Sequence, residues 1–309
     1  MSRFPLYARR GVLPLVVAVL CLRILGDRAV EASPATRAFP GVMPQTVVWA
    51  WEEPEDLRGA DARSVGVAYL AETILLGGEM GVRHRHQPLA VADGAAVMAV
   101  VRIETQTGFR DSPELRERTA HELAEVSQRP EVRALQVDFD ATRSEREFYA
   151  GVLRALRPEM PAGMPLSITA LASWCAVDGR LGSREDWLAG LPIDEAVPMF
   201  FRLGGHARPY GDKSALTVRE PLCRGSIGLS TDESWPGGDA TEASAQRTAQ
   251  RVYLFSPKPW QPAQLTAAAA VPSGERAEVL RVGDDPAHAL RGINDTGLHP
   301  YGHTLEGSR

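Results

Sequence analysis

Eight short apolar runs, separated by segments with helical or turn patterns, constrain the fold of this chain more than any other feature. The runs cover residues 46–51, 65–76, 97–104, 135–140, 166–171, 196–202, 225–230 and 252–255. The third run is almost continuously apolar, as buried parallel strands are. Strands that alternate with helices favour an α/β fold with a parallel sheet, and eight of them match a (β/α)8 barrel.

The segments between the runs predict which helices accompany the strands. Ser112-Pro113-Glu114 begins a helix with an N-cap and a proline in the first turn. Thr142-Arg143-Ser144-Glu145 is a capping box for a second helix, and residues 242–251 also look helical. Residues 82–89 alternate as a polar ribbon instead, which indicates a β-hairpin.

We therefore predict an α/β fold, a (β/α)8 TIM-like barrel with some degenerate helices and a β-hairpin insertion after strand 2. A doubly wound open sheet is the alternative. No glycine-rich phosphate loop follows the first run, which disfavours a nucleotide-binding version of that sheet.

The N-terminus has the pattern of an export signal. Arg3, Arg9 and Arg10 precede an apolar stretch at 12–22, and a plausible cleavage site lies before Ser33. The apolar stretch is short for a bilayer span, and an uncleaved anchor is the alternative. The predicted organisation is a signal peptide or anchor (1–32), a linker (33–43), a barrel domain (44–271) and a polar, loose tail (272–309). The predicted location is periplasmic or secreted.

The charge balance excludes one class of partner. The chain has 39 acidic and 34 basic residues, and 37 and 29 remain without residues 1–32, a net charge of −8. An acidic chain without basic runs argues against a nucleic-acid partner. Membrane contact is expected only through an uncleaved N-terminal anchor. Cys175 and Cys223 could pair in an oxidising compartment, but their spacing alone leaves this open.

The fourth run ends in two carboxylates that dominate any functional interpretation. Because side chains alternate along a strand, Asp138 and Asp140 point to one side and Val137 and Phe139 to the other. Two neighbouring acids at the end of a core strand repel each other and lose water, so such pairs are often kept for catalysis or ligand binding. The structural alternative is that they bind loop amides or cap the next helix.

Ligands of such barrels meet the carboxyl ends of the strands. Acids and arginines there can bond sugar hydroxyls, and indoles can stack on sugar rings. The predicted catalytic residues are Asp138, Asp140, Glu104 and Glu52, and the predicted substrate-binding residues are Trp49, Trp51, Arg102, Trp174, Arg202 and Trp260. An Arg102–Glu104 salt bridge and core positions for Trp49 and Trp51 are the structural alternatives.

We predict no metal and no cofactor. His84 and His86 share a strand face, as metal ligands do, but no third ligand accompanies them, which favours an exposed ribbon. Ser173 lacks the nucleophile-elbow context of a serine hydrolase.

Several of these segments, taken together, resemble a known bacterial family. The segments are Val48-Trp49-Ala50-Trp51-Glu52, Val100-Val101-Arg102-Ile103-Glu104, Gln136-Val137-Asp138-Phe139-Asp140-Ala141, Ala170-Leu171-Ala172-Ser173-Trp174-Cys175 and Asp194-Glu195-Ala196-Val197-Pro198-Met199. In this order they resemble the domain of unknown function 3142 over roughly residues 44–260. That family implies a glycosidase-like barrel and no particular activity.

More distantly, the Asp138/Asp140 strand is similar to the fourth strand of family 18 chitinases. Those strands end in Asp-x-Asp-x-Glu, with the Glu as general acid. Thr142 stands at that Glu position here, so the resemblance does not carry that general acid over.

The functional prediction is an exported, glycosidase-like barrel that acts on or binds a polysaccharide or oligosaccharide. Hydrolysis needs two carboxylates around the scissile bond, one protonated and one ionised. Asp138 or Asp140 would be one of them, and Glu104 or Glu52 the other. The alternative is a non-catalytic carbohydrate-binding or structural envelope protein on the same fold.

Overall fold

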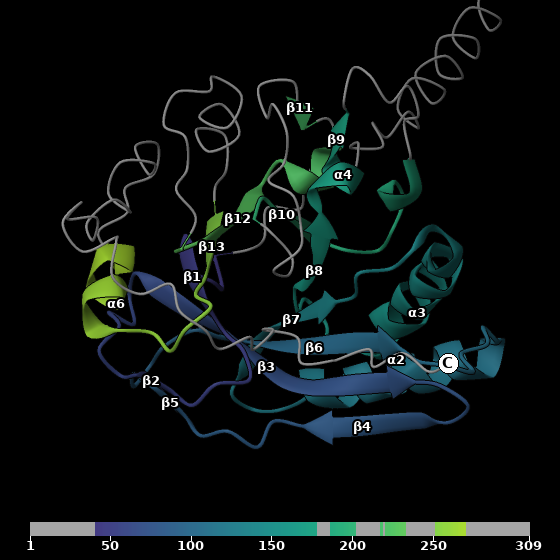
Figure 1. Cartoon of the computed structure of the whole chain (residues 1–309), viewed down its shortest axis with the longest axis horizontal. Helices are drawn as coiled ribbons and strands as arrows, with labels where there is room; N and C mark the ends of the chain where they lie inside the picture. Colours follow the sequence, from purple (N-terminus) through teal and green to yellow (C-terminus); the bar gives the residue numbers. More distant parts are fainter. Residues whose placement is uncertain (1–40, 178–185, 202–216, 219, 233–250, 270–309) are drawn as a thin grey trace, which may run out of the picture. The chain divides into compact units, whose positions relative to one another are not determined.

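A computed structural model describes residues 41–177, 186–201, 217–218, 220–232 and 251–269. Within these residues, eight parallel strands pair in chain order and the last pairs with the first (Figure 1). They are β1 (Thr46–Ala50), β3 (Val65–Leu76), β6 (Val97–Thr105), β7 (Val132–Asp138), β8 (Leu166–Leu171), β10 (Glu195–Met199), β12 (Ser226–Ser230) and β13 (Arg251–Phe255). The predicted barrel is confirmed, because a doubly wound sheet has open edges and this sheet closes.

Helices accompany only some of the strands, as predicted. In the described residues, α2 (Pro113–Ser127) follows β6 and α3 (Arg146–Glu159) follows β7, and the two helices pack side by side outside these strands (Figure 1). The other helical segments are short: α4 (Ala172–Cys175), α6 (Pro262–Ala269), η1 (Arg143–Glu145), η2 (Asp186–Leu188) and η4 (Pro221–Cys223). The predicted helix at 242–251 falls largely outside the described residues, and Arg251 itself begins β13.

Small strands replace helices elsewhere around the barrel. β4 (Met80–His84) pairs antiparallel with the second half of β3, which confirms the hairpin insertion. Between barrel strands, β2 (Glu55–Leu57) pairs with β5 (Leu89–Val91), and β9 (Ala176–Val177) pairs with β11 (Thr217–Val218). Arg85, just after β4, donates to the carbonyls of Trp51 and Glu53 and so ties the hairpin to the end of β1.

Both predicted helix starts are present. The Ser112 hydroxyl accepts the amide of Leu115 at 3.2 Å, and Pro113 is the first residue of α2. The Thr142 amide donates to the Glu145 carboxylate at 2.7 Å, which is one half of a capping box. These caps satisfy amides that the first helical turn leaves without partners.

Apolar side chains from alternate strand positions form two layers. The outward layer of β6 and β7 packs against α2 and α3, and it includes Val101, Leu135 and Val137. The inward layer fills the barrel, where Trp49 stacks on Tyr253 with ring centroids 5.1 Å apart. Because both strand faces are buried, most of the strands read as continuous apolar runs.

A chain of polar side chains crosses this barrel interior. The Trp49 indole donates to Gln136 at 2.8 Å, the Gln136 amide donates to Ser167 at 3.0 Å, and Ser167 donates to Glu195 at 3.1 Å. We call these four residues the inner ladder. Glu195 also forms a buried ion pair with Arg251 at 2.8 Å. Each side chain of the inner ladder therefore has a hydrogen-bond partner, which offsets the cost of removing its polar group from water.

We expect Trp49→Phe to lower the free energy of unfolding by about 1–2 kcal/mol, because it leaves the Gln136 carbonyl oxygen buried without a donor. Chemical denaturation monitored by circular dichroism measures the change. Trp51→Phe is the matched control, since no hydrogen bond of the Trp51 indole is found in the described part of the chain. Equal losses in the two variants would contradict this role of the inner ladder.

Among the described residues, no helix combines the length and the apolar character that crossing a bilayer requires. The predicted signal peptide or anchor, the start of the linker and the whole predicted tail lie outside the described residues.

Candidate active site

The carboxyl end of β6 brings an arginine and a glutamate to the barrel mouth. Arg102 and Glu104 alternate with Val101 and Ile103, which face α2 and α3, so Arg102 and Glu104 face inward. The Arg102 Nε lies 3.0 Å from the Glu104 carboxylate and 3.9 Å from Asp138. Register explains the second distance, because Arg102 and Asp138 are partners in the β6–β7 pairing.

Asp138 is the last residue of β7 and is 5% exposed. The Thr169 hydroxyl, on neighbouring β8, donates to its Oδ1 at 2.6 Å. Burial raises the pKa of Asp138, while the Arg102 charge and the Thr169 hydrogen bond oppose this and the charge of Glu104 adds to it. The two opposing groups both favour the ionised carboxylate.

Asp140 follows two residues later and is exposed to solvent. Its pKa is raised to about 7, first by the loss of surrounding water and second by the negative charge of Asp138. The positive charge of Arg102 opposes this rise. The exposure of Asp140 weakens the first cause, but the repulsion from Asp138 raises the pKa in either case. No described side chain or amide donates a hydrogen bond to Asp140.

The residue that follows Asp138 fixes the direction of that aspartate. Phe139 is 3% exposed and packs edge-on against Tyr149 of α3, with ring centroids 5.2 Å apart. The Tyr149 hydroxyl in turn donates to the Val137 carbonyl at 3.2 Å. Because Phe139 is held against α3, Asp138 at the end of β7 faces away from that helix and toward the barrel interior. Asp140 lies in the turn that follows, where the Ala141 amide donates to the Phe139 carbonyl at 2.8 Å.

The structure thus gathers four of the predicted residues, Arg102, Glu104, Asp138 and Asp140, which we call the mouth cluster. An acid whose pKa is raised to about 7 (Asp140), an acid that accepts a hydroxyl hydrogen bond (Asp138) and an ion-paired acid (Glu104) lie there beside an arginine. Such a set can donate a proton and stabilise a positive charge in the same place.

Other predicted residues occupy different positions. Glu52 is exposed and pairs with Arg83 of β4 at 3.1 Å, which directs it toward the hairpin. Trp51 is half-buried against the inward apolar layer. Arg202 lies outside the described residues.

Three of the predicted tryptophans are packed inside the protein. Trp49 is 2% exposed and belongs to the inner ladder. Trp260 is 5% exposed and donates to the Trp49 carbonyl at 2.8 Å. Trp174 is also 5% exposed and contacts Trp187 edge-on, with ring centroids 4.8 Å apart. Their indole faces are covered by the protein, so we remove them from the set of ligand-stacking residues.

The sequence interpretation missed two polar residues at the mouth. Thr169 contacts Asp138. The sequence pattern that could have indicated it is the alternation of the polar residues Ser167 and Thr169 with apolar residues in the same run. Glu145, taken only as a helix cap, also accepts the Thr105 hydroxyl at 2.6 Å and so links the end of β6 to the β7–α3 connection. This hydrogen bonding lowers the pKa of Glu145, against the effect of its partial burial.

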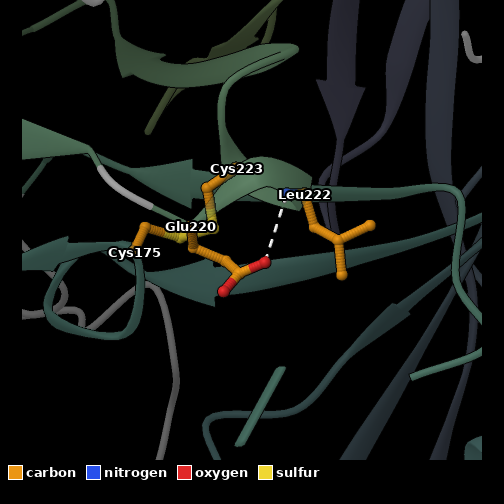
Figure 2. The surroundings of a disulfide bond; sticks show 4 residues. All are labelled: Cys175, Glu220, Leu222 and Cys223. Atoms are coloured by element: carbon orange, nitrogen blue, oxygen red, sulfur yellow. Dashed lines mark hydrogen bonds between the residues drawn. A yellow bond between two sulfur atoms is a disulfide. The ribbon is translucent and has the colours of Figure 1, made fainter. Parts of the chain in front are cut away.

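Cys175 and Cys223 form a disulfide, which answers the question that their spacing left open (Figure 2). The bond joins α4, at the end of β8, to η4, just before β12. Glu220 caps η4 by accepting the Leu222 amide at 3.3 Å (Figure 2). Both cysteines are 1% exposed and belong to the outward apolar layer, so this cross-link is buried among the side chains that cover the outside of the barrel strands.

Within the described ranges, no three His, Cys, Asp or Glu side chains are arranged to hold a metal ion. His84, one of the two histidines on the ribbon, contacts the buried Glu72 carboxylate at 3.1 Å, and its side chain is 64% exposed.

Comparison with solved structures gives matches of low sequence identity. The spore cortex-lytic enzyme SleL of Bacillus cereus is 15% identical with a TM-score of 0.40, and the match covers 64% of this chain and 54% of that one. The chitinase domain of the spore coat protein CotE of Clostridium difficile is 16% identical with a TM-score of 0.39, covering 71% and 67%. The chain thus spans about half the length of SleL.

No curated protein matches the chain. The family model described as Domain of unknown function (DUF3142) matches residues 93–181, which include β6, β7 and β8 and therefore the whole mouth cluster. The match supports the family predicted from the sequence motifs, over the segment of the chain that carries the mouth cluster.

Proposed function

We propose that this protein is an exported glycosidase that hydrolyses a polysaccharide at the mouth of its barrel. The observation that supports the proposal is the mouth cluster, in which Asp140, with its pKa raised to about 7, lies beside Asp138 and the Arg102–Glu104 ion pair. Glycoside hydrolysis needs a protonated and an ionised carboxyl group around one bond.

Asp140 is the proposed general acid. Its pKa of about 7 lets it hold a proton at neutral pH and release it to the leaving oxygen. Its exposure to solvent leaves it accessible to a substrate.

Glu104 is the proposed second carboxylate, acting as base or nucleophile. It is 17% exposed, its partner Arg102 is a cation, and it lies on the strand next to Asp138. We prefer it to Glu52, because Glu52 is paired with Arg83 of the hairpin. Glu104 and Asp138 flank the same Arg102 nitrogen, at 3.0 and 3.9 Å, so Arg102 holds these two carboxylates next to each other at the mouth.

Substrate binding would use the groups that remain accessible at the mouth. Trp51 is half-buried and can offer one indole face to a sugar ring. Arg102 can donate to hydroxyls while it orients the carboxylates. Arg202 stays in the proposal on its sequence position alone.

Export is supported by the disulfide, since such bonds persist in oxidising compartments. We propose that residues 1–32 direct export, as a cleaved signal or an anchor, and that the barrel domain spans 44–271.

The test is hydrolysis of a panel of purified polysaccharides by the full chain, with product detected as new reducing ends. We expect turnover of at least one glycan and a bell-shaped pH dependence of kcat/KM. Its alkaline limb should fall near pH 7, where Asp140 loses its proton. Activity that rises steadily above pH 8 would exclude Asp140 as the acid.

The second candidate is carbohydrate binding without turnover. The Thr169 hydrogen bond to Asp138 and the Arg102 charge 3.9 Å away favour it, because a carboxylate held in this way can serve as a fixed acceptor. Binding of a glycan in calorimetry, with no reducing ends after prolonged incubation, would support this candidate. The absence of any glycan binding would favour a structural envelope protein.

A further inference from the structure

Two hydrogen bonds of the same kind join β7 and β8 inside the barrel. Gln136 and Ser167 are register partners, and their side chains are 3.0 Å apart. One step toward the mouth, Thr169 donates to Asp138 at 2.6 Å. The second bond therefore joins the same two strands at the level where the mouth cluster begins, with its donor on β8 instead of β7.

The Thr169 hydroxyl is a fixed donor. Thr169 is 1% exposed, and a β-branched side chain has few rotamers available on a packed strand. Its proton has a carboxylate oxygen as acceptor at 2.6 Å, which is a short distance for an O–H···O bond. Hydrogen bonds to a charged group are among the stronger ones in proteins.

The two aspartates are therefore unequal. Asp138 receives the Thr169 hydroxyl and has Arg102 at 3.9 Å, whereas Asp140 receives no donor from the described residues. The other groups that face the pair do not reverse this difference. Glu104 is engaged with Arg102, and the Tyr149 hydroxyl, on the helix side, donates to a backbone carbonyl.

We propose that Thr169 is a positioning residue that holds the negative charge on Asp138 and thereby leaves the shared proton on Asp140. Its catalytic consequence rests on the proposed glycosidase function, but the placement of the proton does not. The charge on Asp138 is also what repels ionisation of Asp140. Without the hydroxyl, the two carboxyl groups would compete for the proton on more equal terms.

The test is a titration of individual aspartates in the full chain, followed by NMR of the side-chain 13C carboxyl groups. In Thr169→Val, which keeps the shape and removes the donor, the Asp138 step should rise by about one pH unit. Part of the Asp140 titration should move into that same step. Thr169→Ser should restore the original curves, since serine keeps the hydroxyl.

A buried threonine elsewhere serves as the control. Thr119 of α2 is 0% exposed and donates to the Leu115 carbonyl at 2.7 Å, away from the mouth. Thr119→Val should leave both aspartate titrations unchanged, whatever it does to stability. Thr169→Ala repeats the test if Thr169→Val does not fold.

The outcomes separate the two proposals. Unchanged Asp138 and Asp140 titrations in folded Thr169→Val or Thr169→Ala would overturn the positioning role, even if the protein hydrolyses a glycan. A shifted Asp138 step that Thr169→Ser reverses would support it, even if the wild type turns over nothing. Where turnover exists, Thr169→Val should also lower kcat/KM about tenfold and move its alkaline limb to lower pH.

Discussion

Asp140→Asn is expected to reduce kcat for glycan hydrolysis about 10³-fold, because asparagine cannot donate the proton that the leaving oxygen needs. KM should change much less, since the amide keeps the size and most of the hydrogen-bonding capacity of the carboxyl group. Initial rates of reducing-end release, measured at pH 6 with the best glycan of the panel, give the comparison. The alkaline limb of the pH profile near pH 7 should disappear from the residual activity.

Two further variants show whether the loss is specific. Asp138→Asn should also abolish turnover while glycan binding is retained. Glu125→Gln removes a carboxylate from the exposed face of α2, 62% exposed, and should leave the rate unchanged. An Asp140→Asn variant with at least half of the wild-type kcat would rule Asp140 out as the general acid.

Asp140→Asn should also change the free energy of unfolding, by an amount that depends on pH. The pKa of Asp140 is higher in the folded protein than its ordinary value of 3.8. The contribution of protonated Asp140 to the free energy of unfolding is therefore fully present below about pH 4 and is lost as the pH rises through about 7. Asp140→Asn should accordingly gain stability relative to the wild type between pH 4 and 8. Urea denaturation at several pH values measures this difference.

Removal of the disulfide should give the largest loss of stability. The bond closes a loop of 48 residues between Cys175 and Cys223, and a loop of that length is worth about 4 kcal/mol in the chain-entropy account. The double variant Cys175→Ser, Cys223→Ser should therefore unfold about 10 °C lower. Buried serine hydroxyls in place of the sulfurs add to the loss, because both positions are 1% exposed.

Thermal unfolding with and without a reductant provides the control. Dithiothreitol should lower the Tm of the wild type toward that of the double variant and should not change the Tm of the variant. A wild type whose Tm is the same under both conditions would show that the cross-link contributes little to stability.

The barrel could be predicted from the sequence because its signal is local. Each strand is a short apolar run, and the capped helices at Pro113 and Arg146 stand between the runs as parallel strands require. Strand order followed from chain order. The clustering of Arg102 with Asp138 followed from two strand ends that meet at one edge.

The positions of the tryptophans could not be predicted, for a physical reason. In a closed barrel both faces of a strand are buried. The type of an apolar residue therefore does not distinguish a side chain that faces the helices from one that faces the interior or the mouth. Trp49 and Trp51 point the same way from β1, yet only Trp51 is near enough to the strand end to be half-exposed. The position of a residue along the barrel axis therefore decides whether its side chain is exposed.

Thr169 was missed for a related reason. Threonine is common in strands because its branched side chain suits a pleated surface, so its presence in β8 needed no further explanation. Its contact with Asp138 depends on the register between β7 and β8, which arises from tertiary packing. A buried hydroxyl next to an acidic strand end can be recognised only after that register is known.

The filled interior has a consequence for how a polymer could be handled. Below the aspartates, Trp49, Gln136 and Glu195 occupy the lumen from wall to wall through their mutual contacts with Ser167 and Tyr253. A glycan strand therefore cannot thread through the protein as through a pore. Under the proposed function, a glycan strand would lie across the barrel mouth, and both products would leave from the same side of the protein at which the strand bound.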